Sequence, residues 1–168
     1  PMGELSVGST PTARWVGESS GLTEMRPGNY VYYDRTQVAL GSAGLTDCAL
    51  TILSTVVAVH GDRLILDAGS KTLTSDLVAR AGHPGYGAIF RDAVAVDTLD
   101  DTLLVERLSE EHAIVRVTSG TSCLKLGDRV RILPNHSCPV SNLADEIALV
   151  SGTHVIDGIT IAARGKNS

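Results

Sequence analysis

The strongest constraint on the fold is a pair of extended segments that a two-residue turn joins. Residues 49–60 are rich in β-branched side chains, which favour strands, and residues 63–68 contain the run Leu-Ile-Leu. Between them, Gly61 and Asp62 are residue types typical of a tight hairpin turn. This part of the chain therefore predicts two long antiparallel strands.

The rest of the chain shows the same strand pattern and few helical signals. Residues 35–40 predict one helical turn, residues 13–25 a loop, and the glycine-rich residues 70–93 a long surface loop with short helical pieces. Apolar or alternating runs predict further strands at residues 4–7, 30–33, 103–108, 113–118, 128–133, 146–150 and 153–162. The predicted fold class is mostly β, an antiparallel sheet or barrel with little helix.

Length and charge limit the classes of partner. A chain of 168 residues fits one domain that buries roughly 68–70% of its unfolded surface. Its net charge of -5, without basic clusters, argues against nucleic acid and anionic membranes as partners. No apolar run approaches the ~18 residues that a membrane span needs. The three cysteines are odd in number and widely spaced, which predicts free thiols and a cytoplasmic location.

A histidine and a cysteine form the clearest candidate site. Residues 129–133 alternate charged and apolar side chains, and Pro134 and Asn135 end that predicted strand. His136 and Cys138 are two positions apart, so in an extended segment both side chains would leave the same face. Imidazole and thiolate suit zinc or another divalent metal, and two protein ligands would leave positions open for water or substrate. The alternative is a turn histidine beside a buried structural cysteine.

Several motifs resemble one enzyme family. The run from Pro134 to Glu146 is similar to the metal motif of the D-serine dehydratase and D-threonine aldolase family, pyridoxal-phosphate enzymes of the alanine-racemase type that also use a divalent metal. Further segments that resemble the family, in order along the chain, lie at residues 7–12, 24–34, 109–112 and 163–165. Together they cover nearly the whole chain.

This resemblance implies a domain organisation. Members of the family that this chain resembles consist of two parts, an eight-stranded α/β barrel that holds the cofactor and a C-terminal β domain that follows it. Such a barrel typically needs ~250 residues, more than this chain has. We therefore expect residues 1–28 to be the last segment of a missing cofactor-binding α/β barrel, and residues 29–168 to be the C-terminal β domain that carries the metal motif. A truncation and a split gene product are both open explanations.

The resemblance also implies which partners the chain has and whether it is catalytically active alone. The aldimine-forming lysine of the family lies near the start of the barrel, and none of the lysines here matches its motif (Lys71, Lys125 and Lys166). The chain alone is therefore expected to be inactive. Its implied partners are the N-terminal barrel domain, a second subunit in a homodimer of the full enzyme, and a small β-hydroxy-D-amino acid.

Site residues follow from the matched motifs. A Gly-Ser-Thr-Pro turn is by itself an ordinary turn, but the resemblance implies that Gly8, Ser9 and Thr10 contact the cofactor phosphate. It implies the same for Gly28 and Asn29, with Arg26 as a candidate to face the pyridine nitrogen. His112 is expected at the rim of the active site, where it would help to position His136. The implied metal, zinc or manganese, would be held by His136 and Cys138.

Two reactions fit this set of residues. They are β-elimination, as in D-serine dehydratase, and retro-aldol cleavage, as in D-threonine aldolase. A cysteine as second metal ligand resembles the dehydratases more closely. The competing hypothesis is a non-catalytic β domain that keeps a metal-binding or interaction surface.

Overall fold

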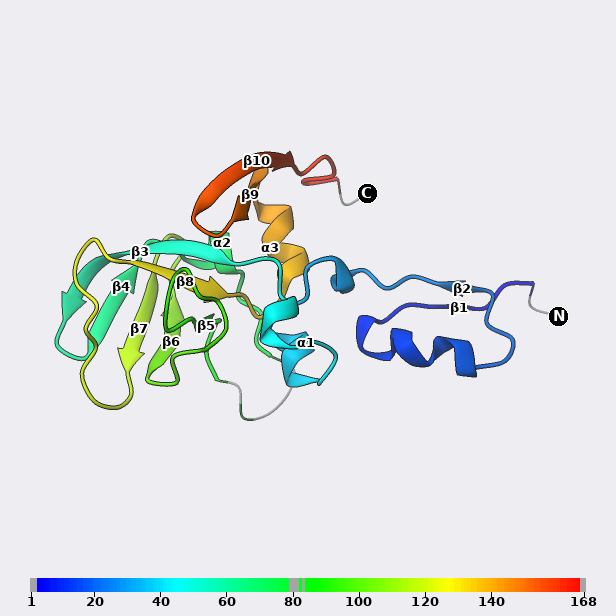
Figure 1. Cartoon of the computed structure of the whole chain (residues 1–168), viewed down its shortest axis with the longest axis horizontal. Helices are drawn as coiled ribbons and strands as arrows, with labels where there is room; N and C mark the ends of the chain where they lie inside the picture. The colour runs from blue at the N-terminus through cyan, green and yellow to red at the C-terminus, as the bar shows by residue number, and fades with distance from the viewer. Residues whose placement is uncertain (1–2, 79–81, 83, 167–168) are drawn as a thin grey trace.

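An antiparallel sheet that nearly closes on itself lies toward one end of the molecule (Figure 1). The computed structural model describes residues 3–78, 82 and 84–166. The sheet has six strands, in the spatial order β5 (Ala88–Ile89), β8 (Arg129–Leu133), β3 (Ile52–His60), β4 (Arg63–Leu66), β7 (Ala113–Val117) and β6 (Leu103–Leu108). The Tyr86 N–H donates to the Val105 carbonyl at 3.0 Å, which links the segment before β5 to the opposite edge strand. The predicted mostly β, barrel-like fold is confirmed.

The predicted hairpin is present at the middle of this sheet. Strands β3 and β4 pair from Val56 with Leu66 to His60 with Arg63, with a register shift between Val56 and Ala58, and Gly61 adopts the positive φ of +61° that the turn requires. Alternate residues of the strands point into one apolar core, as the period of two dictates. Fully buried members of the core are Val56, Leu64, Leu66, Val105, Val115 and Ile132. Each contributes about 1.5–3 kcal/mol by leaving water.

Short helices and a separate hairpin lie beside this sheet (Figure 1). The α-helices are α1 (Arg35–Ala39), α2 (Ser70–Leu73) and α3 (Ser137–Leu143), and a 3-10 helix η3 covers Leu45–Asp47. Strands β9 (Glu146–Ser151) and β10 (His154–Thr160) pair only with each other in the described part of the chain. In the described ranges, no helix is long and apolar enough to cross a membrane.

After residue 28, three local predictions are wrong. Residues 30–33 were predicted as a strand, but Asn29–Val31 form a 3-10 helix, η2, in which the Tyr32 N–H donates to the Asn29 carbonyl at 3.0 Å. Their aromatic and β-branched side chains suit a strand, but no strand in the described part of the chain pairs with them. Within the predicted loop 70–93, Ala88–Ile89 form the buried strand β5, because β8 supplies a pairing edge. The chain after Leu133 was predicted to be extended, but helix α3 begins at Ser137.

The first described residues form a unit of their own. Strands β1 (Ser6–Val7) and β2 (Glu24–Met25) pair in parallel, and the 3-10 helix η1 (Thr10–Glu18) connects them where a loop was predicted. The unit projects from one end of the molecule (Figure 1). None of the residues 3–28 is buried, and in the described chain β1 and β2 have no further strand beside them. Parallel neighbours with a helical crossover are the connection expected in an α/β barrel.

Candidate functional site

A cavity of about 560 Å³ lies where the N-terminal unit meets the helices. Its walls come from segments that are far apart in the sequence: the turn after β1, the turn after β2, the start of α1, the loop after α2 and the start of α3. The residues that line it are Gly8, Ser9, Thr10, Pro11, Arg26, Gly28, Asn29, Asp34, Thr36, Gln37, Asp76, Leu77, His136 and Cys138. All the predicted metal and phosphate residues are therefore brought to one cavity.

His136 and Cys138 reach the cavity by a different geometry from the predicted one. His136 has extended backbone (φ -143°, ψ 106°) as the residue before α3, whereas Cys138 lies in the first turn of that helix. The assumption that both leave one face of an extended segment is therefore wrong. Pro139 is compatible with this helix because a first-turn N–H has no helical partner to lose. The turn of the chain at Ser137 directs both side chains to the same cavity.

Asp76 is the partner of His136. Its Oδ2 lies 2.7 Å from His136 Nδ1, and the two side chains are about half exposed. A carboxylate at Nδ1 favours the tautomer in which Nε2 carries the free lone pair. Nε2 is therefore the ring nitrogen available to ligate a metal.

Asn135 positions the loop that carries Asp76. It is fully buried, and its side-chain amide donates to the Asp76 carbonyl at 2.9 Å and to the Gly85 carbonyl at 2.8 Å. The Arg35 guanidinium donates to the Asn135 Oδ1 at 3.2 Å, and its burial lowers its pKa. The Asp76 backbone is thus tied to the residue next to His136.

Asp34 connects the remaining segments. This carboxylate is fully buried and accepts from the Gln37 N–H at 2.9 Å, which caps α1, and from the Ser137 N–H at 3.0 Å at the start of α3. It also accepts from the Asn29 side-chain amide, which lies 3.7 Å from Cys138 Sγ. Asn29 Oδ1 is buried without a partner in the described part of the chain. Asp34 therefore fixes Asn29 beside the cysteine.

The two predicted phosphate segments are held together. A Cβ on Gly8 would lie 2.8 Å from the Arg26 carbonyl, so only glycine fits this close approach. The Tyr30 N–H donates to the Thr10 hydroxyl at 3.2 Å. The backbone N–H groups of Ser9 and Gly28 donate to no group that the structure describes. Such free N–H groups at a cavity suit an anion.

Arg26 has local partners within the N-terminal unit. Its Nε lies 2.7 Å from Glu24 Oε1 and 2.7 Å from Ser6 Oγ, so its guanidinium is already neutralised at the edge of the cavity.

His112 is not part of this cavity. It lies at the turn between β6 and β7, where its N–H and carbonyl bond to Ser109, and it lines a different hollow with Arg107 and Ile114. The contact with His136 that we expected of His112 is made by Asp76.

The cysteines differ in environment. All three are free thiols. Burial, followed by the charges of Asp34 and Asp47, raises the pKa of Cys48 to about 12, so this thiol is inert as a ligand. Cys138 and Cys123 are exposed, and only Cys138 lines the cavity.

The ligand set for a metal is small. Among the described residues, no group of three or more His, Cys, Asp or Glu side chains is placed to hold a metal ion. His136 and Cys138 can therefore supply at most two ligands, which fits an open site that substrate or water completes. An imidazole whose other ring nitrogen contacts a carboxylate, together with an exposed thiol, is a donor set that zinc prefers.

Sequence comparison finds one family. The family described as "Putative serine dehydratase domain" matches residues 49–150. A D-serine dehydratase of Dictyostelium discoideum is 32% identical over 168 residues, which cover 91% of this chain and 39% of that protein. A D-threonine aldolase of Arthrobacter sp. is 31% identical, over 96% of this chain and 39% of the aldolase. The chain thus spans well under half the length of these two relatives.

A shorter relative also matches. An uncharacterized protein of Mycobacterium bovis is 37% identical over 139 residues, which cover 80% of this chain and 97% of that protein.

Solved structures agree with the fold. The D-threo-3-hydroxyaspartate dehydratase of Delftia sp. HT23 superposes with a TM-score of 0.79 and 27% identity, over 94% of this chain and 44% of the dehydratase. Two variants of such a dehydratase, one with a histidine and one with a cysteine replaced by alanine, also match, and the cysteine variant is in the metal-free form. The two replaced residues are two positions apart in that enzyme.

Proposed function

Because the chain belongs to the family of the serine dehydratase domain, we propose that it is the C-terminal part of a metal-assisted pyridoxal-phosphate lyase acting on β-hydroxy-D-amino acids. The dehydratases and the aldolase named above are lyases, which makes this a family of lyases. The observation that carries the proposal is the single cavity that gathers His136, Cys138 and two segments with free backbone N–H groups.

The metal ligands we propose are His136 Nε2 and the Cys138 thiolate. The same spacing separates the histidine and the cysteine replaced in the dehydratase variants, one of which is metal-free. A thiolate favours zinc over manganese. Asp76 keeps Nδ1 of His136 protonated and the ring fixed, and Asn29 donates toward Cys138 Sγ.

The phosphate contacts we propose are the N–H groups and hydroxyls of Gly8, Ser9 and Thr10, with Gly28 and Asn29 opposite them. When bound, pyridoxal phosphate would supply an electron-withdrawing system at the substrate Cα and the metal a Lewis acid at the β-hydroxyl. The residues of this chain then bind the phosphate, orient the hydroxyl and hold the proton at His136 Nδ1. A cysteine ligand favours the dehydratase reaction over the aldolase reaction.

The domain boundary also remains our proposal. We propose that residues 1–28, of which the structure describes 3–28, complete a barrel that other residues of the enzyme supply. The unpaired edges of β1 and β2 and the lack of buried side chains in this unit support it. None of Lys71, Lys125 and Lys166 lines the cavity, so the cofactor lysine would come from that barrel and the chain alone would be inactive. A homodimer of the full enzyme stays a prediction.

Zinc titration tests the metal site. We expect one zinc per chain in the wild type and a clear loss of affinity in both His136→Ala and Cys138→Ala. Cys123→Ala is the matched control, because Cys123 is also an exposed free thiol but lies outside the cavity. Equal zinc affinity of Cys138→Ala and the wild type would refute Cys138 as a ligand.

Activity is tested on a longer polypeptide. The chain can replace the matching 39% of the Dictyostelium discoideum D-serine dehydratase, whose remaining part would supply the barrel. We expect pyruvate from D-serine, whereas glycine from D-threonine would assign the aldolase reaction instead.

A second candidate is a non-catalytic metal-binding or interaction domain. The mycobacterial relative favours it, because the match covers 97% of that protein. A chimera that binds zinc and cofactor but releases no product from either amino acid would support this alternative.

A further inference from the structure

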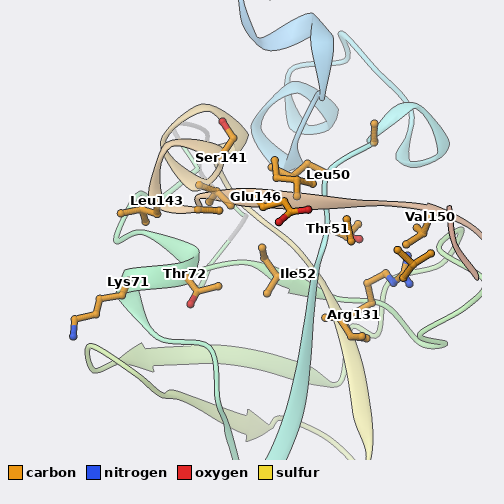
Figure 2. A pocket seen from close by; sticks show the side chains of 17 residues that line it. Leu50, Thr51, Ile52, Lys71, Thr72, Arg131, Ser141, Leu143, Glu146 and Val150 are labelled. Atoms are coloured by element: carbon orange, nitrogen blue, oxygen red, sulfur yellow. The ribbon is translucent and has the colours of Figure 1, made fainter. Parts of the chain in front are cut away.

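A second cavity of about 450 Å³ lies between the start of β3, helices α2 and α3, and the β9–β10 hairpin (Figure 2). It shares no lining residue with the first cavity. Most of its wall is aliphatic, formed by Leu50, Ile52, Val140, Leu143, Ile147 and Val155. Apolar cavities of this size with a few polar groups are typical small-molecule sites.

Three charged side chains line this second cavity, and two of them have no partner among the residues that the structure describes. Lys71 is already paired with Glu111 at 2.5 Å. Arg131 Nε is buried with no hydrogen bond, and its guanidinium has no ion pair in the described ranges. The Glu146 carboxylate likewise has no hydrogen bond or ion pair there. Of the Arg131 guanidinium, only Nε is among the buried unpaired atoms, so the terminal Nη groups are the donors that an anion in the cavity can reach.

The fold holds these two charges apart within the cavity. Arg131 extends from β8 beside Leu53 of β3, whereas Glu146 begins β9 (Figure 2). A Cβ on Gly158 would lie 1.8 Å from Glu146 Oε1. Because glycine has no side chain, the Glu146 carboxylate can lie against β10 at this position. As far as the described residues go, the cavity therefore offers one unpaired cation, one unpaired anion and an aliphatic wall.

We propose that this cavity binds a free α-amino acid with an aliphatic side chain. The ligand carboxylate accepts from the Arg131 guanidinium, the ammonium donates to Glu146, and the side chain packs on the aliphatic wall. A simple fatty acid would leave Glu146 unpaired, and an amine would leave Arg131 unpaired. This site is independent of the metal and cofactor site proposed above.

Calorimetric titration of the chain with leucine, each enantiomer separately, tests the proposal. We expect saturable binding of at least one enantiomer in the range of about 1 mM, typical of a weak small-molecule site. The analogues 4-methylpentanoate, which lacks the ammonium, and 3-methylbutan-1-amine, which lacks the carboxylate, should each bind about tenfold more weakly. The proposal would be overturned if leucine showed no saturable binding, or if either analogue bound with the same affinity as leucine.

Substitutions inside and outside the second cavity test whether leucine binds there. Arg131→Met should weaken leucine binding about tenfold, because a charged hydrogen bond is lost, whereas Arg129→Met on the same strand should not. Arg129 is exposed and lies outside the cavity. Glu146→Gln, an exposed substitution that leaves the core intact, should abolish the preference for leucine over 4-methylpentanoate. His136→Ala should leave leucine binding unchanged, and loss of binding in that variant would place leucine in the first cavity and refute the proposal.

Discussion

Replacing Asp76 by asparagine tests whether the carboxylate orients His136 for a metal. The substitution removes the charge that lies 2.7 Å from His136 Nδ1 and keeps the size of the side chain. An amide can present its NH₂ to Nδ1, which would favour the wrong tautomer and place the proton on Nε2. Zinc would then have to displace that proton.

The expected loss of zinc affinity follows from how exposed the side chains of His136 and Asp76 are. Loss of an outer-shell partner of a metal-ligating histidine costs about 10–100-fold in affinity. The side chains of His136 and Asp76 are 46% and 47% exposed, so water replaces part of the lost interaction and we expect the lower end, about tenfold. A tenfold loss corresponds to about 1.4 kcal/mol. The metal-free protein should lose little stability, because an exposed pair contributes about 0–1 kcal/mol.

Competition with a chromophoric chelator measures the zinc affinity, and thermal unfolding of the metal-free protein measures stability. Asp62→Asn is the control, because it removes the same charge at the β3–β4 turn, outside the cavity. Unchanged zinc affinity in Asp76→Asn would refute the orienting role. A large loss of stability in the metal-free variant would show that Asp76 acts in folding instead.

Three further predictions concern stability and order. Leu66→Ala, at a side chain with no exposed surface, should destabilise the protein by about 2.7–5 kcal/mol in chemical unfolding, and a loss below ~1 kcal/mol would contradict the packing of the core. Partial burial opposes ionisation of Asp67, but hydrogen bonds from the Thr55 N–H and the Ser54 hydroxyl outweigh it and lower the pKa of Asp67. This stabilisation is present above the unfolded-state pKa of about 3.9 and is lost as the pH falls through the lower folded-state value. In urea unfolding, the free energy of unfolding of Asp67→Asn should therefore be lower than that of the wild type at pH 7, and the two values should converge below about pH 4. Amides of residues 3–28 should exchange hydrogen faster than those of the central sheet, and equal protection would argue against an unpartnered N-terminal unit.

Local sequence was sufficient for most of the sheet. Residues 103–108 match β6 in full, and Gly61 with Asp62 marked the β3–β4 turn, because strand alternation and turn chemistry depend on neighbouring residues. The one-turn helix α1 was also predicted, at residues 35–40, and the structure shows that Asp34 caps it by accepting from the Gln37 N–H. The same local rules misassigned residues 30–33, where strand-forming side chains have no strand to pair with in the described ranges.

The sequence by itself also determined which ligands could serve a metal, because imidazole and thiolate chemistry belongs to His136 and Cys138 in any fold. Only the tertiary structure decided which residues surround them. Asp76 is 60 positions from His136, and Asp34 is 103 positions from Ser137, so no local pattern links either pair. The sheet and the buried Asn135 bring these segments together, because buried polar groups must find partners wherever the chain can supply them.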